Sequence, residues 1–300
     1  MKLRHLVGAT GLLLGMAARA VCSPVFVGYY PSWKQGRMND TDLSKYTHVN
    51  IAFGLPHADG TIMMDFELQK IVEDIKSAGS SPVLSIGGWN GSGNFSAIMK
   101  NDASRSALLN IVQVIDEHEL DGVDIDWEFP GKEGNTKDFD AANDTPNYLA
   151  FLTELRKQID EKFGSGNKLI TMAVYALPFS VNGKPSDDVS AFAKVVDYAS
   201  LMLYDFSGTW NKVTGPNAGL YTDDTAGQLS FATSINAWIN AKWPANQLVA
   251  GVPFYGKAYT AMVDMTTDPS KMSQPLNLTL PPGDVDDVPD NKDKPVYSGM

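Results

Sequence analysis

The stretch Asp121-Gly122-Val123-Asp124-Ile125-Asp126-Trp127-Glu128 alternates acidic with large apolar side chains. In an extended strand, residues two apart lie on the same face, so Asp124, Asp126 and Glu128 point one way and the apolar residues between them the other. Burying three carboxylates is costly unless they have partners or a chemical role. Their repulsion raises the pKa of at least one, which keeps a proton available near neutral pH. We expect Glu128, nearest the carboxyl end of the strand, to be the proton donor of an active site.

The same carboxylates could instead hold a cation. A calcium-binding EF-hand loop requires glycine at its sixth position, where this sequence has Phe129, and the intervening residues are bulky and apolar. A Mg²⁺ site at the end of the strand stays open as an alternative. An exposed acidic strand is disfavoured, because Ile125 and Trp127 would then face water.

Short apolar runs recur along the chain on both sides of this stretch. Each has the length of a strand and is enriched in β-branched or aromatic residues, and most are continuously apolar, as in parallel strands covered on both faces. The predicted strands are Val25–Tyr30, His48–Phe53, Pro82–Ile86, Gly122–Trp127, Leu169–Val174, Tyr198–Tyr204 and Leu248–Val252. Amphipathic helix patterns lie between them, and this order implies right-handed crossovers and a parallel sheet.

The helix patterns place apolar side chains at intervals of three and four residues. Four segments show the pattern: Phe66–Ile75, Leu108–Ile115, Tyr148–Ile159 and Ala226–Ile239. We expect the first helix to end at Gly79 and the third to end before Gly164. Strands and helices in this order predict a (β/α)8 TIM barrel rather than an open sheet, and no glycine-rich dinucleotide fingerprint follows the first strand. Because no eighth apolar run follows Val252, we expect the barrel to be incomplete at its C-terminal end.

The composition disfavours several classes of function. The chain of 300 residues has 43% hydrophobic and 20% charged residues, which fits a folded protein with a sizeable core. Its 24 basic and 35 acidic residues give a net charge of −11. Nucleic acid and anionic membrane surfaces would repel such a chain, whereas a neutral substrate is compatible with it.

The first 20 residues predict a secretory signal peptide. Lys2 and Arg4 give a positive start, Leu6–Ala18 is an apolar run too short to span a bilayer, and Ala18-Arg19-Ala20 matches a cleavage site. We therefore expect a secreted, extracellular protein whose domain covers residues 21–300. The one cysteine, Cys22, cannot form an intramolecular disulfide. Glycosylation sequons begin at Asn39, Asn90, Asn94, Asn143 and Asn277.

Five motifs in the same order resemble those of glycoside hydrolase family 18, the chitinases. The acidic stretch matches the family's D-x-x-D-x-D-x-E signature. The other four are Gly28-Tyr29-Tyr30-Pro31-Ser32-Trp33, Ser85-Ile86-Gly87-Gly88, Met202-Leu203-Tyr204-Asp205 and Gly251-Val252-Pro253-Phe254-Tyr255-Gly256. The resemblance spans residues 25–259 and implies the same barrel fold.

The resemblance also implies a reaction. Family members hydrolyse β-1,4 bonds between N-acetylglucosamine units with retention, using the substrate's own acetamido oxygen as nucleophile and no cofactor or metal. In that scheme Glu128 is the acid, Asp126 orients the acetamido group, and Asp124 supports Asp126. Tyr204 would hydrogen-bond the acetamido carbonyl, and Asp205 would contact the sugar near the scissile bond.

Further side chains are expected to bind the sugar chain, because loops after barrel strands build the site and aromatic rings suit the apolar faces of sugars. This set comprises Met202, Tyr30, Trp33, Trp89, Trp210 and Tyr255. Trp238 and Trp243, on or beside a helix, are expected in the core instead. Ser85 would support the carboxylates, and Asp121 would be structural. The partner would be chitin or a chitooligosaccharide, bound by a monomer.

The sequence also departs from the family. Lys257 stands where many members have arginine, and lysine lacks the planar bidentate fork. The family's eighth strand carries a tryptophan beneath the reacting sugar, to which no residue can be assigned; residues 260–300 resemble a loop or the start of an insertion. Three alternatives stay open: a chitin- or glycan-binding lectin without activity, an endo-β-N-acetylglucosaminidase acting on N-glycans, and an incomplete chain whose open barrel exposes two edge strands.

Overall fold

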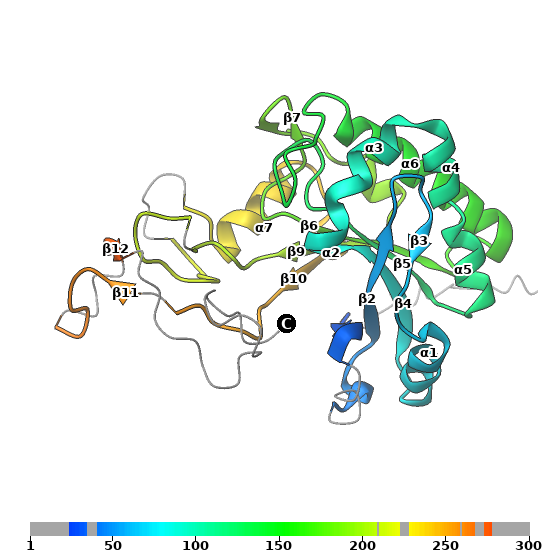
Figure 1. The fold of residues 1–300 in the computed structure, drawn as a ribbon, viewed down its shortest axis with the longest axis horizontal. Helices are drawn as coiled ribbons and strands as arrows, with labels where there is room; N and C mark the ends of the chain where they lie inside the picture. The colour runs from blue at the N-terminus through cyan, green and yellow to red at the C-terminus, as the bar shows by residue number, and fades with distance from the viewer. Residues whose placement is uncertain are drawn as a thin grey trace, which may run out of the picture.

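Parallel strands form one curled sheet at the centre of the computed structural model (Figure 1). In spatial order they are β1 (Val27–Pro31), β2 (His48–Pro56), β4 (Ser81–Gly87), β5 (Gly122–Asp126), β6 (Leu169–Val174), β9 (Tyr198–Met202) and β10 (Leu248–Gly251). All seven predicted strands are present, each within three residues of its predicted ends. In the part of the chain that the structure describes, no strand joins β10 to β1, so the fold is an incomplete (β/α)8 barrel, as predicted.

The structure describes residues 24–34, 41–208, 210–222, 228–258, 260–267 and 273–277. The predicted signal peptide, Cys22, the sequon at Asn39 and the predicted helix start at Ala226 lie outside the described residues. Within them, no helix is long and apolar enough to cross a membrane.

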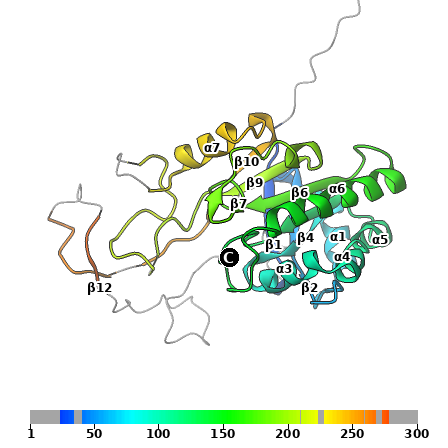
Figure 2. The same cartoon turned by 90° about the horizontal axis from the view of Figure 1, so that it is seen from above.

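Three short antiparallel pairings accompany the main sheet. β3 (Ile62–Met63) pairs with the end of β2, and β7 (Ser180–Val181) pairs with β8 (Lys184–Pro185). After β10, β11 (Thr260–Ala261) pairs with β12 (Leu276–Asn277) and extends to one side of the molecule, away from most of the helices (Figures 1 and 2). The region expected to be a loop or the start of an insertion thus contains a small ribbon.

Helices lie around the outside of the curled sheet (Figure 2). They are α1 (Leu68–Ser77), α2 (Gly88–Gly91), α3 (Phe95–Lys100), α4 (Asp102–Leu108), α5 (Ile111–Glu117), α6 (Asp144–Phe163) and α7 (Phe231–Asn240). Single 3-10 turns occupy Ser32–Lys34, Leu43–Lys45, Ser92–Asn94, Phe192–Lys194 and Ala245–Gln247.

Two helix predictions need correction. The pattern over Leu108–Ile115 predicted one helix, but the structure has α4 and α5, because the backbone tightens to i→i−3 hydrogen bonds from Asn110 to Ala107 (3.0 Å) and from Val112 to Leu109 (3.1 Å). The last predicted helix begins only at Phe231. There the Ser230 and Thr233 side chains cap each other's backbone N–H groups and fix the start of α7.

The apolar face of β5 builds the core between the sheet and the helices. Val123 and Ile125 are fully buried, and Trp127 stacks on Phe95 of α3 with ring centres 5.3 Å apart. Trp238 and Trp243 are 0% and 2% exposed, as the sequence predicted for core residues. The opposite face of β5, with its carboxylates, therefore points toward the concave side of the sheet.

Candidate active site

Asp124 lies at the centre of a buried hydrogen-bond cluster. The register places it between Ser85 of β4 and Thr171 of β6, and both hydroxyls donate to its carboxylate at 2.7 Å. The Tyr29 hydroxyl donates to the same group at 3.0 Å. Burial raises the pKa of Asp124, and these hydrogen bonds oppose the rise. Three donors fix its carboxylate beside the next acidic residue of the strand.

Asp126 is the next carboxyl on this face and is 5% exposed. Its Oδ1 has no hydrogen-bond partner among the described residues. Burial, reinforced by the charges of Glu128 and Asp124, raises the pKa of Asp126 well above its usual value. A buried carboxyl oxygen without a donor is costly, which makes this atom ready to bind a donor from a ligand or to carry a shared proton.

Glu128 lies two residues beyond the last residue of β5, at the carboxyl end of the barrel strands. Burial, with a further contribution from the negative charge of Asp205, raises the pKa of Glu128 to about 7. The acid therefore holds a proton up to neutral pH and becomes a base above it. Because Asp126 and Glu128 raise each other's cost of ionisation, the two carboxyls titrate as a pair.

The backbone of Glu128 is held by a residue that the sequence analysis missed. Its N–H donates to the Ser92 hydroxyl at 2.8 Å, and that hydroxyl donates to the carbonyls of Gly88 (2.8 Å) and Asp126 (3.2 Å). Ser92 is 2% exposed. It thus bridges the residues on either side of Trp127 and sets the direction in which the strand leaves the sheet.

Gly87, the last residue of β4, permits this close approach. Gly87 has a φ of +112°, and a side-chain carbon there would lie 2.1 Å from the carbonyl oxygen of Asp126. An L-residue would therefore clash with the end of β5 in a backbone conformation it rarely adopts. The Ser85-Ile86-Gly87-Gly88 motif thus supplies a hydroxyl to Asp124 and room for β5.

Tyr204 and Asp205 reach the site from the end of β9. Burial, together with the charges of Asp126 and Glu128, raises the pKa of Tyr204, so its hydroxyl stays protonated and can donate. Asp205, at a φ of +59°, accepts a hydrogen bond from the Tyr255 hydroxyl at 2.8 Å and forms an ion pair with Lys257. Lys257, 4% exposed, thus contacts Asp205 despite lacking the arginine fork.

The predicted aromatic residues divide between exposed positions and the core. Trp33, Trp89 and Trp210 are 56%, 49% and 59% exposed on segments that follow β1, β4 and β9. The Lys257 ammonium lies 4.5 Å from the centre of the Trp210 ring. Tyr30, unlike these tryptophans, packs against the core. Burial raises the pKa of its hydroxyl, and the negative charge of Asp74 on α1 raises it further.

The structure therefore places Tyr29, rather than Tyr30, beside the carboxylates. Alternation along β1 turns Tyr29 toward Asp124 and Tyr30 toward the helix layer. Met202 ends β9 and is half-buried. Asp121 lies directly before β5, where its backbone N–H donates to the Pro82 carbonyl and its carboxylate lies 3.7 Å from the Lys168 ammonium. Asp121 is thus at the opposite end of the strand from Glu128.

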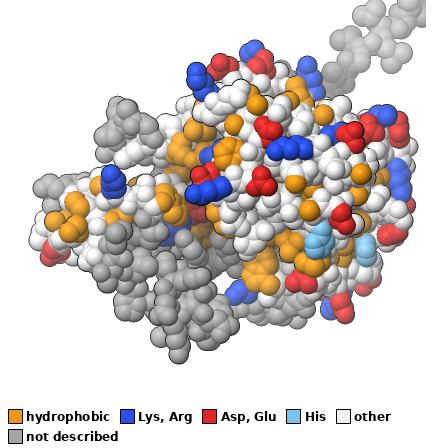
Figure 3. All heavy atoms as spheres, turned by 45° about the horizontal axis from the view of Figure 1, so that its top comes forward, with side chains coloured by type: hydrophobic (Ala, Val, Ile, Leu, Met, Phe, Trp, Pro, Cys, Tyr) orange, Lys and Arg blue, Asp and Glu red, His pale blue; other side chains and the backbone are white. Residues whose placement is uncertain are grey.

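The surface charges and the arrangement of possible metal ligands bear on binding of nucleic acid and of cations. On the face in Figure 3, the basic and acidic side chains of the described residues are interspersed. Those residues contain no group of three or more His, Cys, Asp or Glu side chains arranged to hold a metal ion. The arrangement instead provides a proton donor, a neighbouring buried carboxyl and a neutral phenol at one end of the barrel.

Known proteins with similar sequences and folds supply the context. The chain is 35% identical over 271 residues to a chitinase-like effector of Moniliophthora roreri, covering 83% of this chain and 64% of the relative. It is 30% identical to a class V chitinase of Lotus japonicus, covering 78% of this chain and 60% of that one. The chain thus spans about half to two thirds of the length of these relatives.

A crystal structure of a chitinase from Rhizomucor miehei superposes with a TM-score of 0.77 at 34% identity, covering 92% of this chain and 76% of that one. A group IV chitinase of Ostrinia furnacalis, solved with allosamidin, superposes at 0.70 and 28% identity, with 84% and 71% covered. The model of the glycosyl hydrolases family 18 matches residues 25–293. With this match over most of its length, the chain belongs to glycosyl hydrolases family 18.

Proposed function

We propose that this protein is a secreted chitinase that hydrolyses β-1,4 bonds between N-acetylglucosamine units with retention of configuration. The observation that carries the proposal is the pairing of a protonated Glu128 with a buried Asp126 whose Oδ1 lacks a partner among the described residues. A proton donor at the end of a barrel strand fits acid catalysis at a glycosidic oxygen. The neighbouring carboxyl fits recognition of an acetamido N–H.

The first half of the reaction breaks the glycosidic bond. Glu128 gives its proton to the glycosidic oxygen, which departs with the bonding electrons, while the acetamido carbonyl oxygen of the same sugar attacks the anomeric carbon. Asp126 accepts a hydrogen bond from the acetamido N–H, and its negative charge stabilises the oxazolinium ion that forms. The protonated Tyr204 hydroxyl donates to the acetamido carbonyl and orients it for attack.

The second half regenerates the enzyme. Glu128, now a carboxylate, takes a proton from a water molecule whose oxygen attacks the anomeric carbon and opens the oxazolinium ring. Two displacements at the same carbon return the β configuration. Asp124, held by Ser85, Thr171 and Tyr29, stays fixed beside Asp126 as the proton and charge of the pair redistribute.

The experiment is hydrolysis of a fluorogenic chitooligosaccharide by the purified protein, compared with Glu128→Gln and with Glu161→Gln, an exposed position on α6, as the matched control. We expect turnover by the parent and the control, and a loss of at least about a thousandfold in Glu128→Gln. Turnover that survives in Glu128→Gln would refute the assignment of the acid. A natural N-glycan substrate, assayed in parallel, tests the endo-β-N-acetylglucosaminidase alternative.

Glycan binding without turnover is the second candidate. It is favoured by the three exposed indoles Trp33, Trp89 and Trp210, which suit stacking on sugar rings whether or not a bond is broken. A relative of this chain is described as a chitinase-like effector. Saturable binding of chitooligosaccharides by a cooperatively folded parent that releases no product would select this candidate.

The cellular setting is part of the proposal. The predicted leader over residues 1–20 supports an extracellular protein, and the net charge of −11 disfavours binding to nucleic acid or anionic membranes. The proposed reaction uses the substrate's own acetamido group and therefore needs no cofactor or metal. We expect a monomer. N-terminal sequencing of the exported protein and its mass by light scattering test processing near residue 20 and the oligomeric state.

A further inference from the structure

A buried asparagine on β2 lies next to the hydrogen-bond cluster of Asp124. Asn50 is 0% exposed, and the register of β1 and β2 pairs it with Tyr29, whose hydroxyl donates to Asp124 at 3.0 Å. Both polar atoms of the Asn50 amide, Nδ2 and Oδ1, lack a hydrogen-bond partner among the described residues. A buried amide with unmade hydrogen bonds is costly, so its retention at this place calls for an explanation.

The Asn50 side chain acts on both members of this hydrogen bond. Burial raises the pKa of Tyr29 well above its usual value, and the charges of Asp124 and Asp126 add to the rise. Asn50 opposes it. Burial likewise raises the pKa of Asp124, and Asn50 opposes this rise too, together with the three hydroxyl donors. A group that favours negative charge on a phenol and on a carboxyl alike behaves as a hydrogen-bond donor.

One orientation of the amide accounts for both effects. The Tyr29 hydroxyl gives its proton to Oδ2 of Asp124, so the phenol oxygen keeps lone pairs that can accept from Nδ2 of Asn50. A donor behind the phenol polarises its O–H bond and strengthens the hydrogen bond that the phenol makes to the carboxylate. Asn50 can therefore act on Asp124 through Tyr29.

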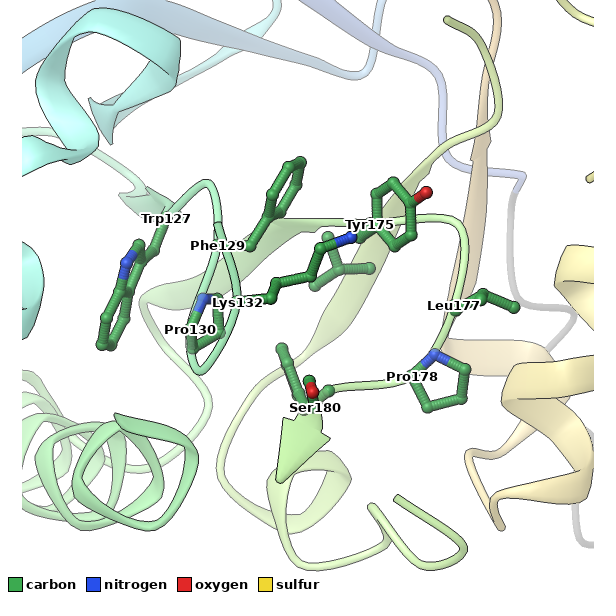
Figure 4. Close-up of a pocket in the computed structure, with 10 residues that line it drawn as sticks. Trp127, Phe129, Pro130, Lys132, Tyr175, Leu177, Pro178 and Ser180 are labelled. Carbon is green, nitrogen blue, oxygen red and sulfur yellow. The ribbon is translucent and has the colours of Figure 1, made fainter. Parts of the chain in front are cut away.

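Neutral groups surround Asp124. In the described part of the chain, three hydroxyls bond its carboxylate, and no lysine or arginine does. The cation on the loop after β5, Lys132, instead lies over aromatic rings, 3.3 Å from the centre of Tyr175 and 5.0 Å from that of Phe129 (Figure 4). The charge of Asp124 acts on carboxyl and phenol groups of several elements: Asp126 of β5, Tyr29 of β1, Tyr148 of α6, Tyr198 of β9 and Tyr204 after β9.

We propose that Asn50 is a positioning residue, which directs the Tyr29 hydroxyl at Asp124 and thereby holds Asp124 as a carboxylate. This inference rests on the function proposed above. Three adjacent carboxyls do not all ionise together, so a charged Asp124 leaves the protons of the site on Asp126 and Glu128. These two are the groups that the proposed reaction brings to the substrate. Asn50 itself reaches the reacting atoms only through intervening residues.

The test is the pH profile of kcat/KM on a chitooligosaccharide for the parent and for Asn50→Val, which removes the donor and suits a strand. Because Asp124 would then take up a proton at higher pH, we expect the acidic limb to move up by roughly half a unit to one unit. The alkaline limb and KM should stay in place. Asn50→Ala, which cannot clash with its neighbours, is measured beside it and should shift the acidic limb in the same direction.

A double-mutant cycle tests the route through Tyr29. Tyr29→Phe removes the hydroxyl that joins Asn50 to Asp124 and should itself move the acidic limb to higher pH. Adding Asn50→Val to Tyr29→Phe should then cause little further movement, since the two changes interrupt one chain of hydrogen bonds. Equal movement by Asn50→Val with and without the Tyr29 hydroxyl would refute this route.

A matched control separates positioning from a loss of stability. Ser80, 5% exposed and located directly before β4, donates to the carbonyls of Leu43 (2.7 Å) and Tyr46 (2.8 Å). Ser80→Ala also removes a buried polar group and should destabilise the fold, but it should leave both limbs of the pH profile in place. An acidic limb unmoved in Asn50→Val and Asn50→Ala, with turnover intact, would overturn the inference and leave the proposed function standing.

A measurement without substrate keeps the two proposals apart. Carbon-13 NMR of aspartate-labelled protein follows the ionisation of Asp124, whose resonance is identified by its loss in Asp124→Asn. We expect Asp124 to titrate at higher pH in Asn50→Val than in the parent. This shift in a protein that releases no product would support the inference while refuting the proposed function. An unchanged titration in an active enzyme would refute the inference alone.

Discussion

Replacing Ser92 by alanine tests how the position of the acid is maintained. The substitution removes the acceptor of the Glu128 N–H (2.8 Å) and the donor to Gly88 and Asp126 at a site that is 2% exposed. A buried N–H left without a partner costs about 1–3 kcal/mol. We therefore expect Ser92→Ala to lower the free energy of unfolding by about 2 kcal/mol and Tm by about 4 °C.

The same substitution should affect catalysis more than binding. Since the freed backbone holds the acid less firmly against the glycosidic oxygen, kcat should fall roughly tenfold to a hundredfold while KM changes little. Guanidinium unfolding followed by circular dichroism gives the stability, and initial rates on a chitooligosaccharide give the kinetics. Ser44→Ala, which removes an exposed hydroxyl bonded to Asp42, is the control and should cost less than about 0.5 kcal/mol. A Ser92→Ala protein with the parent's stability and kcat would refute the reasoning.

Further predictions follow from the carboxyls and the core. The pKa of Glu128 is raised from its ordinary value near 4.5 to about 7 in the folded protein. The protonated side chain therefore stabilises the fold fully below pH 4.5, and this contribution is lost as the pH rises through 7. Glu128→Gln should flatten the dependence of the unfolding free energy on pH over this range, as measured by chemical unfolding at several pH values. Asp205→Asn removes a charge that raises the pKa of Glu128, so the alkaline limb of kcat/KM should move to lower pH; a move to higher pH would contradict the assignment. Trp238→Ala, at a fully buried position against Phe179 and Trp243, should cost about 3–5 kcal/mol in chemical denaturation, and a cost below about 1 kcal/mol would contradict its place in the core.

The sequence contains enough information to predict the strands and the common face of the three carboxylates on and after β5. Continuous apolar runs predict buried parallel strands, and the spacing of Asp124, Asp126 and Glu128 fixes their common face without any knowledge of the neighbours. The burial of Trp238 and Trp243 also follows from their place on or beside an amphipathic helix. These features depend on local periodicity, which a single sequence records.

Contacts between distant segments could not be predicted in this way. Whether Tyr29 or Tyr30 faces the carboxylates depends on the direction in which β1 presents its side chains, which two adjacent tyrosines do not reveal. Ser92 contacts Glu128 across 36 residues, and an isolated serine carries no pattern that indicates this. The division of α4 from α5 depends on tightened backbone hydrogen bonds around Asn110, within an apolar periodicity that continues through it.

The central claim is that Glu128 and Asp126 support hydrolysis in which the substrate's acetamido group is the nucleophile. The most direct measurement is proton NMR of the anomeric configuration of the product during the first minutes of chitotetraose hydrolysis, before mutarotation. We expect the newly formed reducing end to be the β anomer in the parent and no product to form in Glu128→Gln. Initial release of the α anomer, or product formation by the variant, would contradict it.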